Sequence, residues 1–313
     1  MSKTSSIKML AVCACALLFL AACSGEKTVS QAEIMSSDSA LEPESVSQAE
    51  SETETSEEPL PEPESEPEPE PESEPEPEPD RSKEYVYEQN PELTPVNYES
   101  PALLPATDDM GQDYQDSIVF ICDSPTYWMG PFGLLKDGAD TTQIWTGPEG
   151  TMTLAYQSDY KILDPFDRQE KPIREVVRLH KPERMVIALG INGIMFMDEE
   201  YFTAEYTDLV TDIKEISPET DLILQSMYPI TPAYKNWGAI TNVLITEGNS
   251  WILKIAEATG CRYLDTFSVL VGDDGNAKPE LMQADGLHPN KDGLTLVLGY
   301  IRTHGHEQPD PTE

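Results

Sequence analysis

The feature of this sequence that most limits what it can fold into is an acidic, proline-rich stretch between Gly25 and Asp80. It holds 20 of the chain's 58 acidic residues, 10 of its 27 prolines and a single basic residue, Lys27. A segment of this composition cannot bury enough apolar surface to fold. The sequence therefore predicts one folded domain in the remainder, which is long enough to bury a sizeable core.

The end of this stretch, from Pro59 to Asp80, nearly alternates glutamate and proline. Proline favours extended polyproline-II geometry, and repulsion between like charges stiffens the segment further. At ~3.1 Å per residue, its 22 residues reach about 68 Å. We expect a tether that holds the domain away from a membrane. An acidic tract that binds Ca²⁺ or a partner is the alternative, although nothing in it fixes a coordination geometry.

The first 22 residues have the pattern of an export signal. Lys3 and Lys8 are followed by an apolar run of 14 residues, which is shorter than the ~20 that span a bilayer. The run ends in Leu-Ala-Ala followed by Cys23, which resembles the bacterial lipobox, where the cysteine is lipidated and becomes the mature N-terminus. We expect an exported protein anchored through a lipid on Cys23. An ordinary signal peptide followed by a chance cysteine is the alternative.

Charge and cysteine content exclude several classes of protein. The formal net charge is −38, of which −21 falls on residues 81–313, so nucleic acid and anionic membrane surfaces would repel the domain. No Cys and His residues have metal-finger spacing. Only Cys122 and Cys261 fall in the folded part. Both lie in apolar runs, which favours two buried thiols over a disulfide.

From residue 117 onward, short apolar runs rich in β-branched residues alternate with amphipathic segments. The predicted strands are Ser117–Cys122, Arg184–Gly190, Asp221–Gln225 and Cys261–Leu264, and the predicted helices are Glu170–His180, Glu199–Ile216, Ile240–Thr259 and Lys291–Thr303. This alternation predicts a mainly parallel sheet covered on both faces. Ligands of such sheets bind beyond the carboxyl ends of the strands, so polar residues there are the candidates for chemistry.

Three polar motifs follow predicted strands or precede the last helix. They are Asp123-Ser124-Pro-Thr, Gly-Ile-Asn192-Gly and Asp285-Gly-Leu-His288-Pro. Each alone is typical of a helix cap or a turn. Together they contain what acyl transfer requires: a hydroxyl nucleophile in Ser124, an imidazole base in His288 and a carboxylate in Asp285 to orient that base. The Asn192 amide and a glycine N–H are candidate donors to the oxyanion.

The order of these motifs resembles that of the SGNH (GDSL-type) hydrolases, over roughly Gln112 to His304. The resemblance implies a flavodoxin-like three-layer α/β/α sandwich and hydrolysis of esters, including acetyl esters on carbohydrates, without a metal or organic cofactor. It implies Ser124 as nucleophile, His288 as base and Asp285 as its partner. Ser124, Asn192 and Gly150 would donate to the oxyanion, with Gly147 as the alternative glycine. The elbow G-x-S-x-G is absent, which argues against the α/β-hydrolase fold.

The sequence departs from the family pattern at two positions. Cys122 occupies the position of the first-block glycine, and no Asp follows Asn192 at the next position. Both changes predict a lower activity or a different substrate. For Asp123, accepting backbone N–H bonds around the turn is favoured over a catalytic role.

Large apolar side chains near these motifs have two interpretations. The aromatic residues Tyr127, Trp128 and Trp145 either stack on sugar rings or pack in the core. The run Met195–Met197 either lines an acyl pocket or makes an ordinary loop contact.

Taken together, the sequence predicts a signal peptide over residues 1–22, a disordered acidic linker over 23–83 and a hydrolase-like domain over 84–313. The expected function is that of a lipid-anchored extracellular serine esterase that removes acetyl or other short acyl groups from carbohydrate or cell-envelope esters. The expected partners are an acylated carbohydrate or other small ester and the membrane. The sequence does not indicate an oligomeric state, and a monomer is the default. The alternatives are a weakly active or inactive glycan-binding surface lipoprotein and a structural surface protein whose motif matches are accidental.

Overall fold

The computed structural model describes residues 77–235 and 240–306. The chain divides into two units, Met1–Glu70 and Pro71–Glu313, and all of the described residues lie in the second. The predicted export signal, Cys23 and most of the predicted linker therefore lie outside the described residues. Within the described residues, no helix combines the length and apolarity needed to cross a membrane.

The centre of the second unit is a parallel sheet of five strands. They are β1 (Ile118–Cys122), β2 (Ile144–Trp145), β5 (Arg184–Ala188), β6 (Asp221–Gln225) and β7 (Arg262–Leu264). Their spatial order is β2-β1-β5-β6-β7, and every neighbouring pair is parallel. Numbered along the chain, the five strands have the order 2-1-3-4-5, which is the flavodoxin-like order.

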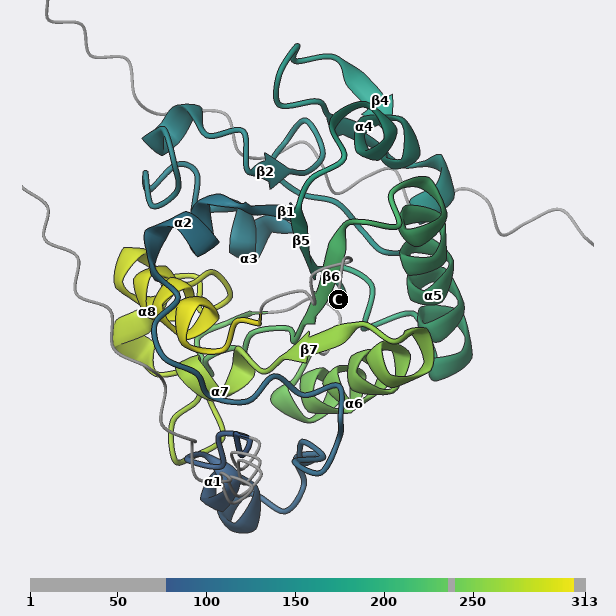
Figure 1. Ribbon diagram of the computed structural model, residues 1–313. Helices are drawn as coiled ribbons and strands as arrows, with labels where there is room; N and C mark the ends of the chain where they lie inside the picture. Colours follow the sequence, from purple (N-terminus) through teal and green to yellow (C-terminus); the bar gives the residue numbers. More distant parts are fainter. Residues whose placement is uncertain (1–76, 236–239, 307–313) are drawn as a thin grey trace, which may run out of the picture. The chain divides into compact units, whose positions relative to one another are not determined.

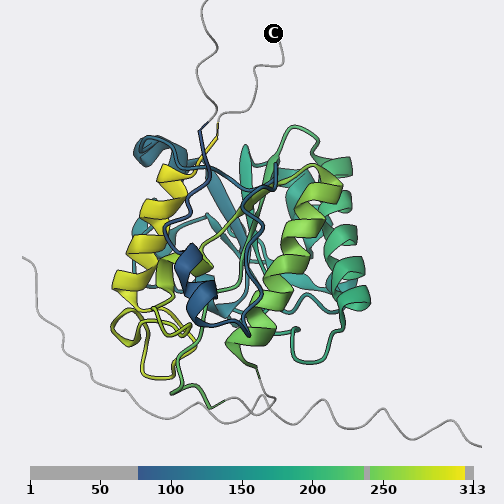
Figure 2. The same ribbon diagram turned by 90° about the horizontal axis from the view of Figure 1, so that it is seen from below.

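Helices cover both faces of this sheet, as Figures 1 and 2 show. The apolar side chains of the strands alternate between the faces: Phe120 and Cys122 belong to one buried cluster, and Ile121 belongs to the other. On the Ile121 side lie α4 (Ile173–His180), α5 (Glu199–Ile216) and α6 (Asn242–Thr259). On the opposite side lie α2 (Gly111–Asp116), α7 (Phe267–Leu270) and α8 (Lys291–Thr303). The predicted fold class, a three-layer α/β/α sandwich with a parallel sheet, is confirmed.

The sequence predicted none of the remaining short elements. These are α1 (Glu84–Gln89), α3 (Ser124–Tyr127), the 3₁₀ turns η1 (Gly138–Asp140), η2 (Gln157–Asp159) and η3 (Pro279–Leu281), and the antiparallel hairpin of β3 (Lys161–Leu163) and β4 (Glu170–Pro172). The helix predicted over 170–180 was wrong in its first three residues. They pair with β3, and the helix begins only at Ile173 because Pro172 serves as its extended N-cap.

The two cysteines of the described part are both free and buried, as predicted. Cys122 lies opposite Ala188 in the sheet and is fully buried. Its backbone has no positive φ. The strand therefore accommodates a thiol at the position where the family pattern has glycine.

Candidate active site

Ser124 lies at the point where β1 ends and α3 begins. Asp123 is the extended N-cap of α3, and Pro125 occupies the first turn, where a fixed φ is compatible with a helix start. The chain thus turns sharply from strand to helix. This turn places the half-buried Ser124 at the carboxyl end of the central sheet.

The loop before α8 brings His288 and Asp285 to Ser124. The Nε2 atom of His288 lies 2.9 Å from Ser124 Oγ, and its Nδ1 atom lies 2.7 Å from Asp285 Oδ2. The other oxygen of Asp285 accepts the backbone N–H groups of Leu287 and His288 at 2.9 and 3.0 Å. Hydroxyl, imidazole and carboxylate therefore form one continuous chain of hydrogen bonds, with the connectivity of a serine hydrolase triad.

The tight packing of this loop depends on Gly286, whose φ is +74°. A Cβ atom there would come within 2.3 Å of Thr231 Oγ1 and 2.7 Å of the Tyr234 nitrogen. The backbone N–H of Thr231 also donates to the Gly286 carbonyl at 2.9 Å. The loop after β6 thus supports the His288 loop. The sequence carried no signal for this contact, because the two segments lie far apart along the chain.

Asp285 is held in its ionised form. Partial burial acts to raise its pKa, but the hydrogen bonds from the His288 ring and from the backbone N–H groups of His288 and Leu287 outweigh burial, and the pKa is lowered. An ionised carboxylate on Nδ1 leaves Nε2 free to accept the Ser124 proton. It would also stabilise the imidazolium that results.

The two other candidate oxyanion donors are engaged within the protein. The Nδ2 group of Asn192 donates to Thr151 Oγ1 at 2.9 Å and to the Met152 carbonyl at 2.8 Å. The N–H of Gly150 donates to the carbonyl of Gly147 at 3.0 Å. Asn192 therefore joins the loop after β5 to the loop that contains Gly150, and the oxyanion role of both residues stays a prediction.

Both candidate glycines are required by packing. Gly150 has a φ of +72°, and a Cβ atom there would lie 2.5 Å from the Tyr127 ring. A Cβ atom on Gly147 would lie 2.3 Å from the Thr151 carbonyl oxygen. Steric packing therefore explains the presence of glycine at both positions. It does not distinguish Gly147 from Gly150 as the oxyanion donor.

The aromatic and methionine side chains near the site separate into two groups. The Trp128 ring lies edge-on to the His288 ring at 6.5 Å and stacks on Phe132 at 5.4 Å. Trp145, in contrast, is buried in the core and donates its indole N–H to the Thr142 carbonyl. Met197 is also buried, whereas its neighbours 195 and 196 are exposed. Of the tryptophans considered from the sequence, only Trp128 borders the Ser–His pair.

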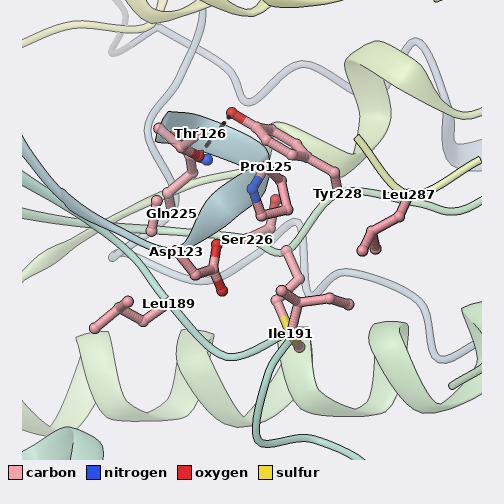
Figure 3. A pocket seen from close by; sticks show the side chains of 11 residues that line it. Asp123, Pro125, Thr126, Leu189, Ile191, Gln225, Ser226, Tyr228 and Leu287 are labelled. Atoms are coloured by element: carbon pink, nitrogen blue, oxygen red, sulfur yellow. Dashed lines mark hydrogen bonds between the residues drawn. The ribbon is translucent and has the colours of Figure 1, made fainter. Parts of the chain in front are cut away.

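Behind the Ser124 turn lies a small cavity of about 10 Å³, shown in Figure 3. Its polar lining includes Asp123, Thr126, Gln225, Ser226 and Tyr228. Thr126 Oγ1 donates to the Tyr228 hydroxyl at 3.2 Å, the dashed contact in Figure 3. The sequence did not indicate that Gln225 and Tyr228 line a cavity beside the site. Gln225 appears in the sequence analysis only as the last residue of a predicted strand.

Asp123, one of the residues that line this cavity, is almost completely buried. Burial raises the pKa of its carboxyl group to about 8, and the backbone N–H groups of Ile191 and Gly190 lower it only in part. The interpretation from the sequence, that Asp123 accepts backbone N–H bonds around the turn, agrees with these contacts.

Solved structures with similar folds come from several bacteria. A putative platelet activating factor from Streptococcus pneumoniae is 17% identical, with 60% of this chain and 83% of that chain covered and a TM-score of 0.45. A putative acylhydrolase from Bacteroides fragilis is 17% identical over 70% and 92% of the two chains, with a TM-score of 0.42. An acetylxylan esterase from Geobacillus stearothermophilus is 17% identical over 64% and 97%, with a TM-score of 0.40.

No curated protein sequence matches the chain. Residues 150–296 match the model of the GDSL-like lipase/acylhydrolase family. The matched region contains Gly150, Asn192, Asp285 and His288, and it begins after Ser124. The similarity to this family therefore covers residues 150–296 and leaves out the segment that carries Ser124.

Proposed function

We propose that the protein is a serine esterase that removes acetyl or other short acyl groups from carbohydrate or cell-envelope esters. The observation that carries this proposal is the hydrogen-bonded chain from Ser124 Oγ through His288 to Asp285, at 2.9 and 2.7 Å. The family match supports an ester hydrolase in general terms. The acyl and alcohol halves of the substrate are part of the proposal.

In the proposed mechanism, His288 Nε2 takes the proton of Ser124 as Oγ attacks the ester carbonyl carbon. The imidazolium then returns this proton to the departing alcohol, which leaves an acyl group on Ser124. His288 then takes a proton from water as the water attacks the acyl-enzyme, and the imidazolium gives this proton to Ser124 Oγ as the carboxylic acid leaves. The N–H of Ser124, as the first of a helix, has no acceptor within that helix and can donate to the oxyanion. Asn192 and Gly150 would join it by exchanging their present acceptors.

The surroundings of His288 favour a sugar as the alcohol half of the substrate. The leaving alcohol must lie close to His288, because His288 protonates it. There the Trp128 ring, backed by Phe132, offers an aromatic surface of the kind that packs against sugar rings.

The test is hydrolysis of p-nitrophenyl acetate by residues 24–313, beside Ser124→Ala and His288→Ala variants of equal foldedness. We expect each substitution to reduce kcat by at least about 10³-fold. Comparison of p-nitrophenyl acetate with the octanoate ester then tests the preference for short acyl groups. Wild-type activity no higher than that of Ser124→Ala would contradict the esterase assignment.

A second candidate is a weakly active glycan-binding surface protein. The observation in its favour is that the Asn192 amide and the Gly150 N–H are both paired inside the protein. Binding to acetylated glycans that persists in Ser124→Ala, without turnover in the wild type, would support this candidate.

The place of action is a further part of the proposal. We propose that Cys23 carries a lipid and that the acidic linker holds the domain away from the membrane. The lipobox-like sequence before Cys23 and the Glu-Pro run support this arrangement.

A further inference from the structure

Residues 227–231, which follow β6 after Ser226, contact both of the segments that carry the candidate catalytic groups. We call them the bridging segment. Near its start, the Tyr228 hydroxyl accepts a hydrogen bond at 3.2 Å from Thr126, in the short helix α3 that begins with the nucleophile (Figure 3). At its end, the Thr231 N–H donates at 2.9 Å to the carbonyl of Gly286, in the loop of the candidate base. One short piece of chain therefore connects the nucleophile turn to the base loop.

Two buried asparagines of α6 hold the backbone of the bridging segment. Asn249 Oδ1 accepts the Met227 N–H at 2.8 Å, and Asn249 Nδ2 donates to the carbonyl of the same residue at 3.1 Å. Asn242 pairs in the same way with the N–H and the carbonyl of Ile230, both at 2.9 Å. The asparagines lie seven positions apart, about two helical turns, so they share one face of α6. Each amide side chain thus pairs with the segment as a neighbouring strand would.

The hydrogen-bonding capacity of Asn242 is fully used, which fixes the orientation of its amide. Its second N–H donates to Asn276 Oδ1 at 3.1 Å. The residue has no equivalent neighbour on α6 with the same contacts: Thr246, equally buried and between the two asparagines in sequence, accepts the N–H of Thr94, which precedes β1. The contact with the bridging segment therefore belongs to the asparagines and not to the buried face of α6 in general.

We propose that Asn242 and Asn249 are positioning residues that fix the bridging segment and thereby the separation of Ser124 Oγ and His288 Nε2. The expected effect on rate rests on the proposed esterase function. The two reacting atoms are 2.9 Å apart, and proton transfer requires a separation of about 2.6–3.2 Å. A shift of either loop by about 1 Å takes the pair out of this range and can lower the rate by about 10²-fold. Because both asparagines are buried, they act through the bridging segment and not on the substrate.

The first test is site-resolved hydrogen exchange, which needs no activity and so separates this inference from the esterase assignment. In the wild type, the N–H groups of Met227, Ile230 and Thr231 should exchange as slowly as those of β6, although they lie in a loop. Asn242→Leu replaces the amide by an apolar side chain of similar size. It should accelerate exchange at Ile230 and Thr231 by at least about tenfold and leave β6 unchanged. Exchange of the wild-type groups at the rate of an open loop, or no acceleration in Asn242→Leu, would overturn the proposal.

The second test is steady-state hydrolysis of p-nitrophenyl acetate, with rates expressed per folded molecule. Asn242→Leu and Asn249→Leu should each lower kcat by about 10- to 100-fold and change KM much less, because the substrate still binds but the reacting pair is misplaced. A merely structural role would reduce the amount of folded protein and leave kcat per folded molecule unchanged, and that result would overturn the proposal. A wild type without esterase activity would contradict the esterase assignment, and the exchange test would still decide whether the asparagines hold the segment.

Tyr228→Phe is a milder variant for the case in which the leucine variants do not fold. It removes only the hydroxyl that meets Thr126 and keeps both asparagine pairs. It should lower kcat less than the leucine variants do, with little change in KM, and leave exchange at Thr231 as in the wild type. A wild-type kcat in Tyr228→Phe would contradict the contribution of the bridging segment to the position of the nucleophile.

Thr246→Val is the matched control on α6. It removes a buried hydroxyl whose acceptor role is toward Thr94 and not toward the bridging segment. It should leave kcat and the exchange rate of the Thr231 N–H unchanged, even where it lowers the free energy of unfolding. A loss of kcat equal to that of Asn242→Leu would show that any disturbance of α6 is sufficient, and it would overturn the specific role of the asparagines.

Discussion

At the scale of single residues, Asp285 illustrates how one side chain can combine a proposed chemical role with a structural one. Its Oδ2 atom holds the His288 ring, and its Oδ1 atom accepts two backbone N–H groups of the same loop. The conversion Asp285→Asn keeps an acceptor for the loop but places an NH₂ group where a carboxylate is needed. The two roles can therefore be separated by substitution.

We predict that Asp285→Asn lowers kcat by about 10³- to 10⁴-fold, because the amide favours the wrong tautomer of His288 and cannot stabilise the imidazolium. The melting temperature should change little. Asp285→Ala is the control: it should lose comparable activity and also lower the melting temperature, since the N–H groups of Leu287 and His288 lose their acceptor. Steady-state kinetics and thermal unfolding of both variants provide the measurement. Activity of Asp285→Asn within tenfold of wild type would contradict the assigned role.

Only part of the candidate site was predictable from the sequence. The predicted residues belong to short local motifs, whereas the other features depend on contacts between distant segments. Ser124, Asp285 and His288 belong to short motifs at strand or helix ends, so their convergence follows from the parallel sheet. The acceptors of Asn192 and Gly150 depend on loop conformations that have no local sequence signal. The burial of Asp123 depends on several distant segments and is invisible in the sequence.

At the scale of elements, prediction succeeded where the signal is local and long enough. The 18-residue helix α5 and the 13-residue helix α8 have the predicted bounds, because amphipathic patterns of that length have few alternatives. The two-residue strand β2 is too short to show a pattern. The hairpin of β3 and β4 has only three residues in each strand and one buried position, Ile162, which is too little to show an apolar alternation in the sequence.

This hairpin is attached to α4 by a buried carboxylate. Asp164 follows β3 and lies 2.5 Å from Lys171 Nζ on β4 and 3.1 Å from His180 Nε2 at the end of α4. Burial acts to raise the pKa of Asp164, but the contacts with Lys171, the Phe166 N–H and His180 outweigh burial and lower the pKa far below its usual value. A carboxyl group with a lowered pKa stabilises the fold above about pH 4, and this contribution is lost as the pH falls further.

We predict that Asp164→Asn lowers the free energy of unfolding by about 3 kcal/mol at pH 7, because one partner of a buried ion pair is removed. The difference from wild type should shrink as the pH falls from 4 toward 2. Asp167→Asn is the matched control, since Asp167 contacts the same lysine but its side chain is 52% exposed, so its substitution should lower the free energy of unfolding much less. Urea unfolding at several pH values measures both. An equal decrease in the free energy of unfolding for the two variants would contradict a larger stabilising role of Asp164 than of Asp167.

At the scale of the whole molecule, the net charge and the order of the segments suggest separate roles for the folded domain and for the acidic segment that precedes it. We expect the formal charge of −38 to repel nucleic acid, which favours uncharged or weakly charged substrates. The Glu-Pro run, with a reach of about 68 Å, would let the domain sample a layer of that depth around its anchor. We expect an esterase tethered in this way to act on cell-envelope or nearby glycans rather than on distant soluble esters.

This arrangement depends on Cys23, and we predict that it carries a lipid. Expressed in a bacterial host with radiolabelled palmitate, the wild-type chain should incorporate label and partition into detergent. Cys23→Ala should incorporate none. The matched control is Cys15→Ala, which alters a cysteine inside the apolar part of the same signal and should be labelled like the wild type. An unlabelled wild-type chain, released in soluble form after cleavage, would identify an ordinary signal peptide. The domain would then act without an anchor, and the Glu-Pro run would need a role other than that of a tether.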